Sequence, residues 1–215
     1  MDKLEITNNA STRFVNELKR KSFHFLSAGI PLGYYWTNYD VAIWVIGGLL
    51  TLALAVEYAR AYSERANKLF HQFFGQMLRT EEASSYSGAT FLLISSFLVV
   101  LIFHKDVAIL CLLFLIFGDG MAAIIGKKFG RTRIFGKTLE GTLAFAITAL
   151  GVGFFFLQVP FSIRLIGALT AALVELLPIR TSDNLRIPIL SGSVMEILYV
   201  HFLRNLPDSG HDVVV

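Results

Sequence analysis

The stretch VAILCLLFLIFGDGMAAIIG, residues 107–126, decides the fold of this chain. Asp119 is the one acidic or basic side chain among its 20 residues. A helix needs about 20 predominantly apolar residues to span the hydrocarbon core of a bilayer, so this stretch is long enough to cross a membrane. Of all 215 residues, 54% are apolar and 16% are charged, against about 25% charged in soluble proteins. The sequence therefore predicts an integral membrane protein.

Six further apolar segments predict additional transmembrane helices. They cover residues 23–37, 41–58, 88–103, 139–157, 161–177 and 187–203. The predicted fold is an all-α, polytopic bundle of about seven spans. Six spans are the alternative, because His24 lowers the hydrophobicity of the first segment and Glu196 places a charge within the last one.

The predicted spans divide the chain into three parts. We expect a cytoplasmic N-terminal segment over residues 1–22, a single transmembrane domain over residues 23–203 and a tail over residues 204–215. The polar N-terminal residues lack the apolar core of a secretory signal, so no cleaved signal peptide is expected.

The distribution of Lys and Arg predicts the orientation, because cytoplasmic loops of membrane proteins carry an excess of these residues. With seven spans and a cytoplasmic N-terminus, 16 of the 19 Lys and Arg residues fall on the cytoplasmic side. The exceptions are Lys105, Arg164 and Arg204. The net charge of +3 is then explained by the excess of Lys and Arg in cytoplasmic loops, which anionic lipid headgroups attract. We expect no nucleic-acid partner, and in a prokaryote the location would be the cell membrane.

The first long cytoplasmic loop, residues 60–86, predicts an amphipathic helix. Its apolar residues recur at helical spacing and are Ala66, Leu69, Phe70, Phe73, Phe74, Met77 and Leu78. Charged and amide side chains lie between them, which is typical of a helix in the membrane interface. A connector role and a surface that presents a lipid substrate both remain open.

The second long loop, residues 127–138, is basic and is associated with Gly126, Gly130 and Gly136. Glycines let backbone N–H groups approach an anion that cations neutralise, so the loop suits phosphate. A Walker loop requires four residues between its two glycines and a preceding strand. Here five residues separate Gly130 from Gly136, and a predicted span precedes them. A Walker loop is excluded, while a phosphate and metal site beside Glu140 remains a hypothesis.

Ionisable residues inside predicted spans are a further indication of function, because each costs several kcal/mol at bilayer depth unless it is paired. Asp119 lies eight residues before the basic loop, which places it roughly 12 Å below that loop. Glu57, Glu140 and Glu175 lie near the cytoplasmic ends of their segments. Carboxylates and cations are therefore expected to converge at one face. Glu196 is deeper and is interpreted as a helix-pairing residue.

Residues 118–141 contain a specific signature: Gly118-Asp119-Gly120-Met121-Ala122-Ala123, then Gly126, Phe129-Gly130 and Gly136-Lys137-Thr138-Leu139-Glu140-Gly141. Weaker pieces flank it in order: Arg20-Lys21-x-x-His24, Glu57 with Arg60, Arg79 with Glu82 before Ser87-Gly88-Ala89-Thr90, and Glu175 before Asp183-Asn184 and Pro188. Over residues 17–190 the chain thereby resembles the CTP-dependent lipid-alcohol kinases, which include dolichol kinase, phytol and farnesol kinases and the yeast-type diacylglycerol kinase.

The resemblance implies transfer of the γ-phosphoryl group of CTP to the hydroxyl of a lipid alcohol. The acceptor would be dolichol or another polyprenol, phytol, farnesol or diacylglycerol, and the site would face the cytoplasm. The resemblance also implies Mg²⁺ or another divalent cation, which is compatible with oxygen ligands. Phosphoryl transfer itself depends mainly on positioning and charge neutralisation.

The resemblance further implies roles for individual residues. The catalytic candidates are Asp119, Glu140 and Lys137, and the metal-ligand or base candidates are Asp119, Glu140 and Asp183. The nucleotide and phosphate candidates are Arg20, Lys21, Gly126, Lys127, Gly130, Gly136, Thr138 and Asn184. Further candidates are His24, Glu57, Arg79, Glu82 and Glu175.

Two alternative functions have different requirements. A phosphatidate cytidylyltransferase also uses CTP, but it releases pyrophosphate and carries a Pro-Gly-His-Gly-Gly signature that this sequence lacks. A small transporter would also bury charged residues, but it predicts inverted repeats, and none is convincing in this sequence. A lipid kinase is therefore the favoured function.

Overall fold

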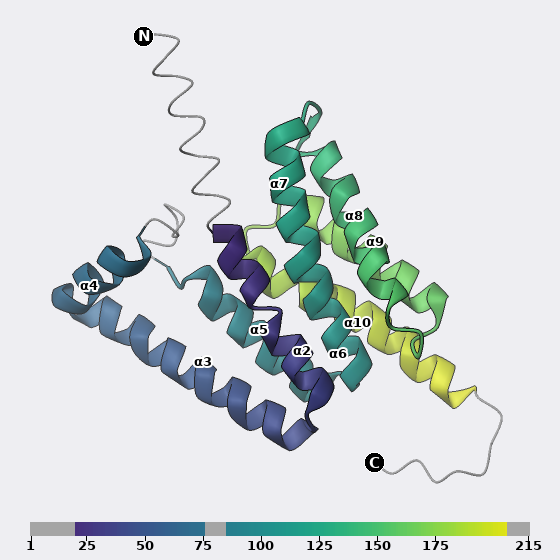
Figure 1. The fold of residues 1–215 in the computed structure, drawn as a ribbon, viewed down its shortest axis with the longest axis horizontal. Helices are drawn as coiled ribbons and strands as arrows, with labels where there is room; N and C mark the ends of the chain where they lie inside the picture. The colour runs from purple at the N-terminus through teal and green to yellow at the C-terminus, as the bar shows by residue number, and fades with distance from the viewer. Residues whose placement is uncertain (1–19, 76–84, 206–215) are drawn as a thin grey trace.

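The computed structural model of the protein describes residues 20–75 and 85–205. The apolar stretch that decides the fold lies in one continuous helix, Lys105–Phe129. This helix comprises α6 (Lys105–Leu113), the π-helical segment η2 (Phe114–Asp119) and α7 (Gly120–Phe129). Every residue from 107 to 116 is buried, as expected for a helix that is apolar on all sides. The other helices of the bundle surround it (Figure 1).

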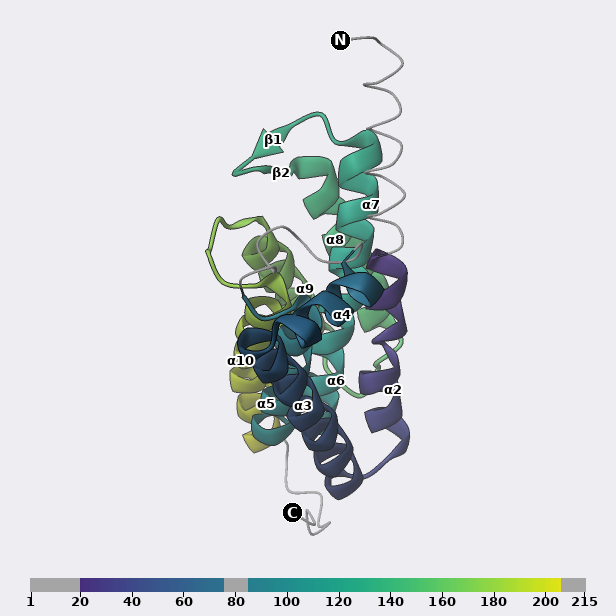
Figure 2. The same ribbon diagram turned by 90° about the vertical axis from the view of Figure 1, so that its left-hand side faces the viewer.

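The 20–26 helix and several other helices pack directly against this central helix, and α3 (Tyr39–Tyr62) and α4 (Glu64–Phe74) lie further out. Besides the 20–26 helix, the packed helices are α2 (Gly29–Trp36), α5 (Gly88–Ile102), α8 (Leu139–Phe154), α9 (Phe161–Leu176) and α10 (Asp183–Arg204). The outer helix α3 packs on α5, and α4 crosses its C-terminal end (Figure 2). This arrangement leaves most of α3 facing outward, with Trp44 81% exposed.

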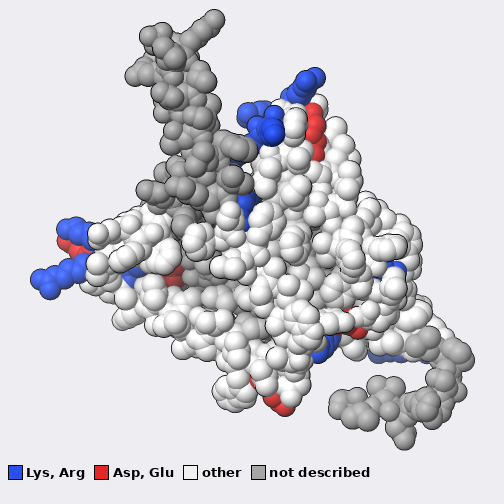
Figure 3. Space-filling view, in the orientation of Figure 1, with Lys and Arg blue, Asp and Glu red and all other residues white. Residues whose placement is uncertain are grey.

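Three described helices are long and apolar enough to cross a membrane: α3, the central helix and α10. The shorter helices α5 and α8 are also apolar. Charged side chains gather at the α4 end and at the outer end of α7, and a few more lie along the lower and right-hand edges in Figure 3. A broad uncharged surface lies between them. These features indicate an integral membrane protein. The count of about seven spans remains a prediction.

The N-terminal region differs from the predicted continuous span over residues 23–37. Residues 20–26 are helical, the chain turns at residues 27–28, and α2 follows. The Ser27 hydroxyl donates to the His24 carbonyl at this turn. Ser27 lies in the interruption, and Gly29, which carries no side chain, follows it. The region therefore forms two short helices.

The predicted amphipathic helix is present as α4. Ser63 begins it by accepting a hydrogen bond from the backbone N–H of Ala66 at 3.4 Å, as N-cap residues do. The apolar side chains of Leu69 and Phe73 are exposed, Phe73 by 73%. Met77 and Leu78, which the prediction also included, lie outside the described residues. The location of α4 in the membrane interface remains a prediction.

The basic loop forms a small antiparallel hairpin of β1 (Arg133–Ile134) and β2 (Lys137–Thr138), which the all-α prediction did not include. Phe135 and Gly136 make its two-residue turn with φ angles of 50° and 85°. Such turns favour Asn-Gly, because both central residues have positive φ. A bulky residue with positive φ is strained, and the Phe135 ring is 65% exposed.

We predict that Phe135→Asn stabilises the protein by about 1 kcal/mol, because asparagine tolerates the left-handed conformation better than phenylalanine. Thermal unfolding of the purified protein in detergent measures this effect. The control is Phe129→Asn, which also removes an exposed ring but from the end of α7. Equal or lower stability of Phe135→Asn would contradict the strained turn.

Candidate active site

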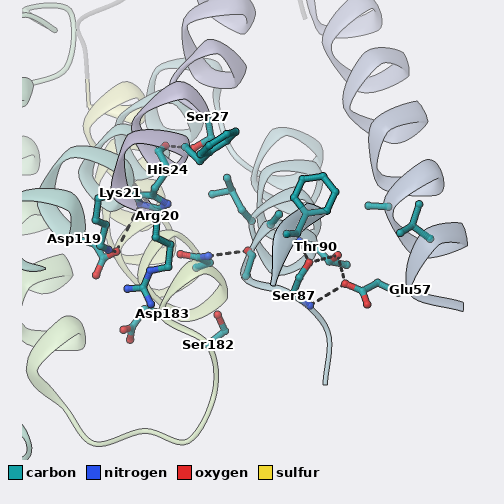
Figure 4. Close-up of a pocket in the computed structure, with 18 of the residues that line it drawn as sticks. Arg20, Lys21, His24, Ser27, Glu57, Ser87, Thr90, Asp119, Ser182 and Asp183 are labelled. Atoms are coloured by element: carbon teal, nitrogen blue, oxygen red, sulfur yellow. Dashed lines mark hydrogen bonds and ion pairs between the residues drawn. The ribbon is translucent and has the colours of Figure 1, made fainter. Parts of the chain in front are cut away.

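A cavity of about 350 Å³ lies where the 20–26 helix, α3, α4, α5 and the start of α10 meet (Figure 4). Asp119, at the end of η2, also lines it. One part of its wall carries charged and polar side chains, and the other part is apolar. The cavity therefore offers two chemically different surfaces in one space.

A buried ion pair forms the polar wall. Lys21 donates to Oδ2 of Asp119, and the two side chains are 3% and 10% exposed. Nε2 of His24 lies 3.6 Å from the same oxygen and has no hydrogen-bond partner among the described residues. Removing one partner of a buried ion pair leaves the other charge uncompensated. Lys21 and Asp119 thus stabilise each other while holding the 20–26 helix against the central helix.

The sequence around Asp119 explains how the carboxylate is positioned. The π-helical segment η2 ends at Asp119, and such segments often occur at functional sites. A Cβ atom at Gly118 would lie 2.7 Å from the Phe145 ring, and one at Gly120 would lie 2.3 Å from the Phe25 ring. Both glycines are needed because these rings pack directly against the helix beside Asp119.

Two helix N-termini face the cavity. Ser87 begins α5 by accepting from the backbone N–H of Thr90 at 3.3 Å, and residues 87–90 line the cavity together with residues 182–184 at the start of α10. Nδ2 of Asn184 donates to the Gly88 carbonyl at 2.7 Å and ties the two ends together. Each N-terminus carries about half a positive charge. Together they offer backbone N–H donors of the kind that bind phosphate.

Further cations lie on the same side. Arg20 points into the space between Asp119 and Asp183 (Figure 4). Nζ of Lys137 lies 2.8 Å from Oε1 of Glu175 and 3.1 Å from Oδ2 of Asp183. Asp183 also pairs with Arg186. These contacts connect the hairpin, α9 and α10 at the edge of the cavity.

Arg186 holds the loop between α9 and α10. Its Nη1 donates to the carbonyls of Leu177 at 2.8 Å and Ile179 at 3.0 Å. The side chain is buried, and its pairing with Asp183 fixes the first turn of α10. The sequence places Arg186 only among the 16 Lys and Arg residues predicted to lie on the cytoplasmic side. Its spacing of three residues from Asp183 is the signal that could have identified this pair.

Glu57 fixes the opposite wall. Its Oε1 accepts from the Ser87 backbone N–H at 2.8 Å and from the Thr90 hydroxyl at 2.9 Å. Its Oε2 pairs with Arg60 at 2.6 Å. All four residues are buried. This network attaches α3 to the N-terminus of α5, so Glu57 positions the wall of the cavity.

The apolar wall comes mainly from α3 and α4. Phe70 and Phe74 of α4 line the cavity and pack together with ring centroids 5.0 Å apart. The guanidinium carbon of Arg60 lies 4.0 Å from the Phe70 ring centroid, a favourable cation–π geometry. Phe23 and Val56 complete this surface. It suits the hydrocarbon part of an amphiphilic ligand.

Three of the predicted loop residues have a packing role. A Cβ atom at Gly126 would lie 2.6 Å from Oγ1 of Thr138, and one at Gly130 would lie 2.5 Å from Cγ2 of the same side chain. Thr138 itself caps α8 by accepting from the backbone N–H of Gly141 at 3.2 Å. The small residues therefore let α7, the hairpin and α8 meet closely around Thr138.

Comparison with known proteins gives three informative relatives. The chain is 26% identical over 220 residues to the CTP-dependent diacylglycerol kinase 1 of Saccharomyces cerevisiae, which covers 88% of this chain and 76% of that protein. It is 32% identical over 138 residues to the dolichol kinase of the same yeast, covering 60% of this chain and 25% of that enzyme. An uncharacterized protein of Rickettsia prowazekii is 28% identical over 183 residues, 80% of this chain and 90% of that protein.

The chain is a homologue of the CTP-dependent lipid kinases. The predicted resemblance is thus confirmed. No protein-family model and no solved structure matches the chain.

The geometry brings together part of the site predicted from the lipid-kinase resemblance. Residues that line the cavity are Arg20, Lys21, His24, Glu57, Asp119, Asp183 and Asn184. Lys137 adjoins it through its ion pair with Asp183, and Glu175 pairs with Lys137 in turn. Arg79 and Glu82 lie outside the described residues. The catalytic and binding roles themselves remain predictions.

The remaining predicted residues of the kinase signature do not line the cavity. They are Gly126, Lys127, Gly130, Gly136, Thr138 and Glu140. Glu140 lies in the first turn of α8 and accepts from the Thr132 backbone N–H at 3.1 Å, so its carboxylate braces the base of the hairpin. The structure separates it from the cavity carboxylates Asp119 and Asp183.

The metal prediction for this lipid-kinase homologue can be compared with the available oxygen donors. Within residues 20–75 and 85–205, no group of three or more His, Cys, Asp or Glu side chains could hold a metal. Mg²⁺ in phosphoryl-transfer sites commonly uses one or two carboxylates together with substrate phosphates. Asp119 and Asp183 line one cavity and supply two carboxylates. These carboxylates pair here with Lys21 and with Lys137 and Arg186, so a metal would have to share them with these cations. The predicted three-carboxylate set with Glu140 remains a prediction.

We predict that Lys21→Met lowers stability by about 3–5 kcal/mol, because Asp119 is left buried without its cation. The double variant Lys21→Met/Asp119→Asn is expected to recover most of this loss, because it removes both charges. Thermal unfolding in detergent measures the difference, with the exposed α4 substitution Lys68→Met as the control. A single variant as stable as wild type would contradict a structural ion pair.

Proposed function

We propose that this protein is an integral-membrane kinase that transfers the γ-phosphoryl group of CTP to the hydroxyl of a lipid alcohol. One observation carries the proposal: a single cavity combines a wall of charged and polar side chains, which includes two helix N-termini, with an apolar wall. Phosphates suit the first wall, and a hydrocarbon chain suits the second. The homology to CTP-dependent lipid kinases supports CTP as the phosphoryl donor.

The polar wall provides the interactions that phosphoryl transfer requires. Arg20 and Lys21 neutralise charge, and the N-termini of α5 and α10 direct backbone N–H groups toward the phosphates. Asp119 and Asp183 would hold Mg²⁺ with the nucleotide. When bound, the ion neutralises charge on the transferred group. These interactions are strongest for a polyanion, in agreement with a triphosphate donor.

The reaction forms one oxygen–phosphorus bond and breaks another. The acceptor hydroxyl oxygen bonds to the γ-phosphorus, the bond from that phosphorus to the bridging oxygen breaks, and CDP leaves. The hydroxyl proton passes to a base at the cavity wall. Asp119 and Nε2 of His24, which both line the cavity, are our candidates for this base.

The apolar wall favours a lipid acceptor that enters from the bilayer. Phe70 and Phe74 lie on α4 and line the cavity, and Leu69, Phe73 and Phe74 of this helix are exposed. We infer that α4 lies in the cytoplasmic interface and presents the hydroxyl end of the lipid to the cavity. The concentration of Lys and Arg at this end of the molecule supports a cytoplasmic active site.

Product analysis tests the proposed reaction. Purified protein in lipid nanodiscs is incubated with Mg²⁺, each nucleoside triphosphate and diacylglycerol, farnesol, phytol or a polyprenol. We expect CTP to give CDP and one phosphorylated lipid class. Pyrophosphate and a CDP-lipid would instead identify a cytidylyltransferase, and turnover with ATP alone would contradict the donor.

A matched pair of α4 variants tests the lipid wall. Phe74 lines the cavity, whereas its neighbour Phe73 does not. We predict that Phe74→Ala raises the KM for the lipid acceptor by about 3–10-fold, because a partly buried aromatic contact is lost. The KM for CTP should stay within about twofold. Steady-state kinetics measures both constants, and an equal effect of Phe73→Ala would contradict the assignment.

A further inference from the structure

A second cavity, of about 550 Å³, adjoins the first. Glu57 lines both cavities and therefore forms part of the wall between them. Residues 87–90 line the first cavity, while Ser85, Tyr86 and Phe91 line the second. The two spaces thus meet along the same short segment at the start of α5.

The second cavity has an aromatic and polar lining. The Tyr86 ring packs edge-on to Phe91, with ring centroids 6.1 Å apart, and the Tyr86 side chain is half exposed. Asn67 of α4 and Arg60 of α3 contribute an amide and a guanidinium. Such a lining suits a planar polar ring, because rings stack on aromatic side chains and amides bond their edges.

Asn67 has hydrogen-bonding capacity to offer. Within the described part of the chain, its side-chain amide makes no hydrogen bond and forms no ion pair. An asparagine amide supplies two donor hydrogens and one acceptor oxygen. This pattern complements the edge of a pyrimidine such as cytosine. A ring nitrogen there accepts a hydrogen bond, and the exocyclic amino group beside it donates one. Tyr86 can stack on the face of the same ring.

We propose that the second cavity binds the cytosine ring of CTP, with Asn67 on its edge and Tyr86 on its face. The proposal rests on the proposed function, which places the triphosphate in the first cavity. A nucleotide joins a polyanionic chain to a planar ring, and the two adjoining cavities provide one environment for each. Glu57 and Arg60, already paired with each other, are positioning residues in the wall between them.

Two binding probes separate the base from the phosphates. Isothermal titration of the purified full-length protein compares CTP with inorganic tripolyphosphate, which has no ring. Asn67→Ala and Tyr86→Leu are each expected to raise the Kd for CTP about tenfold, equivalent to about 1.4 kcal/mol at 25 °C. The Kd for tripolyphosphate and the KM for the lipid acceptor should stay within about twofold.

Two control variants make the test specific. Tyr86→Phe retains the ring and should bind CTP nearly as wild type does. Tyr58→Leu removes an aromatic ring that is 66% exposed on α3 and lines neither cavity, so it should have no effect.

Several outcomes would overturn the base site. They are unchanged CTP affinity in both Asn67→Ala and Tyr86→Leu, an equal loss of tripolyphosphate affinity, or an effect confined to the lipid KM. The last result would identify a lipid-headgroup pocket. In each of these cases wild-type turnover with CTP would leave the proposed kinase function intact. Wild-type protein that neither binds nor consumes CTP would refute both proposals.

Discussion

The buried pair of Lys21 and Asp119 is the interaction on which the candidate site depends. It fastens the 20–26 helix to the π-helical break in the central helix. A buried charge is costly without a partner, so each of the two residues depends on the other for charge compensation. Gly118 and Gly120 belong to the same arrangement, because aromatic rings occupy the space beside them. In the Gly118-Asp119-Gly120 signature, the glycines therefore allow close packing of the aromatic rings, and Asp119 forms part of the cavity's polar wall.

The polar wall of the cavity suits phosphate, and the apolar wall suits a lipid from the membrane. Asn184 and Glu57 hold the helix N-termini and α3 in place, and Arg60 extends this network to Phe70 of α4. A polar and an apolar surface consequently meet within one space. In the proposed mechanism, the bilayer supplies the hydroxyl from the α4 side while the nucleotide arrives from the cytosol. The amphipathic helix would then be part of the substrate path.

The sequence predicted the apolar helices well, because apolar length is a local signal. It also predicted that carboxylates and cations converge at one face, and Asp119 and Glu57 do line one cavity with Arg20 and Lys21. Glu140, which that prediction included, does not line the cavity. It could not show that residues 107–116 are enclosed while α3 faces outward, since both segments are similarly apolar. Gly126 and Gly130 were interpreted as phosphate-loop glycines, but their contacts with Thr138 require the tertiary structure. Asn67 and Tyr86 belong to no motif, and only the fold places them beside Glu57.

The most direct measurement is the structure of the protein with a non-hydrolysable CTP analogue and Mg²⁺ bound. We predict that the triphosphate lies in the cavity lined by Arg20, Asp119 and Asp183, between the N-termini of α5 and α10. A triphosphate bound instead on the outer face of the hairpin, at Lys127, Lys128, Arg131 and Arg133, would contradict it.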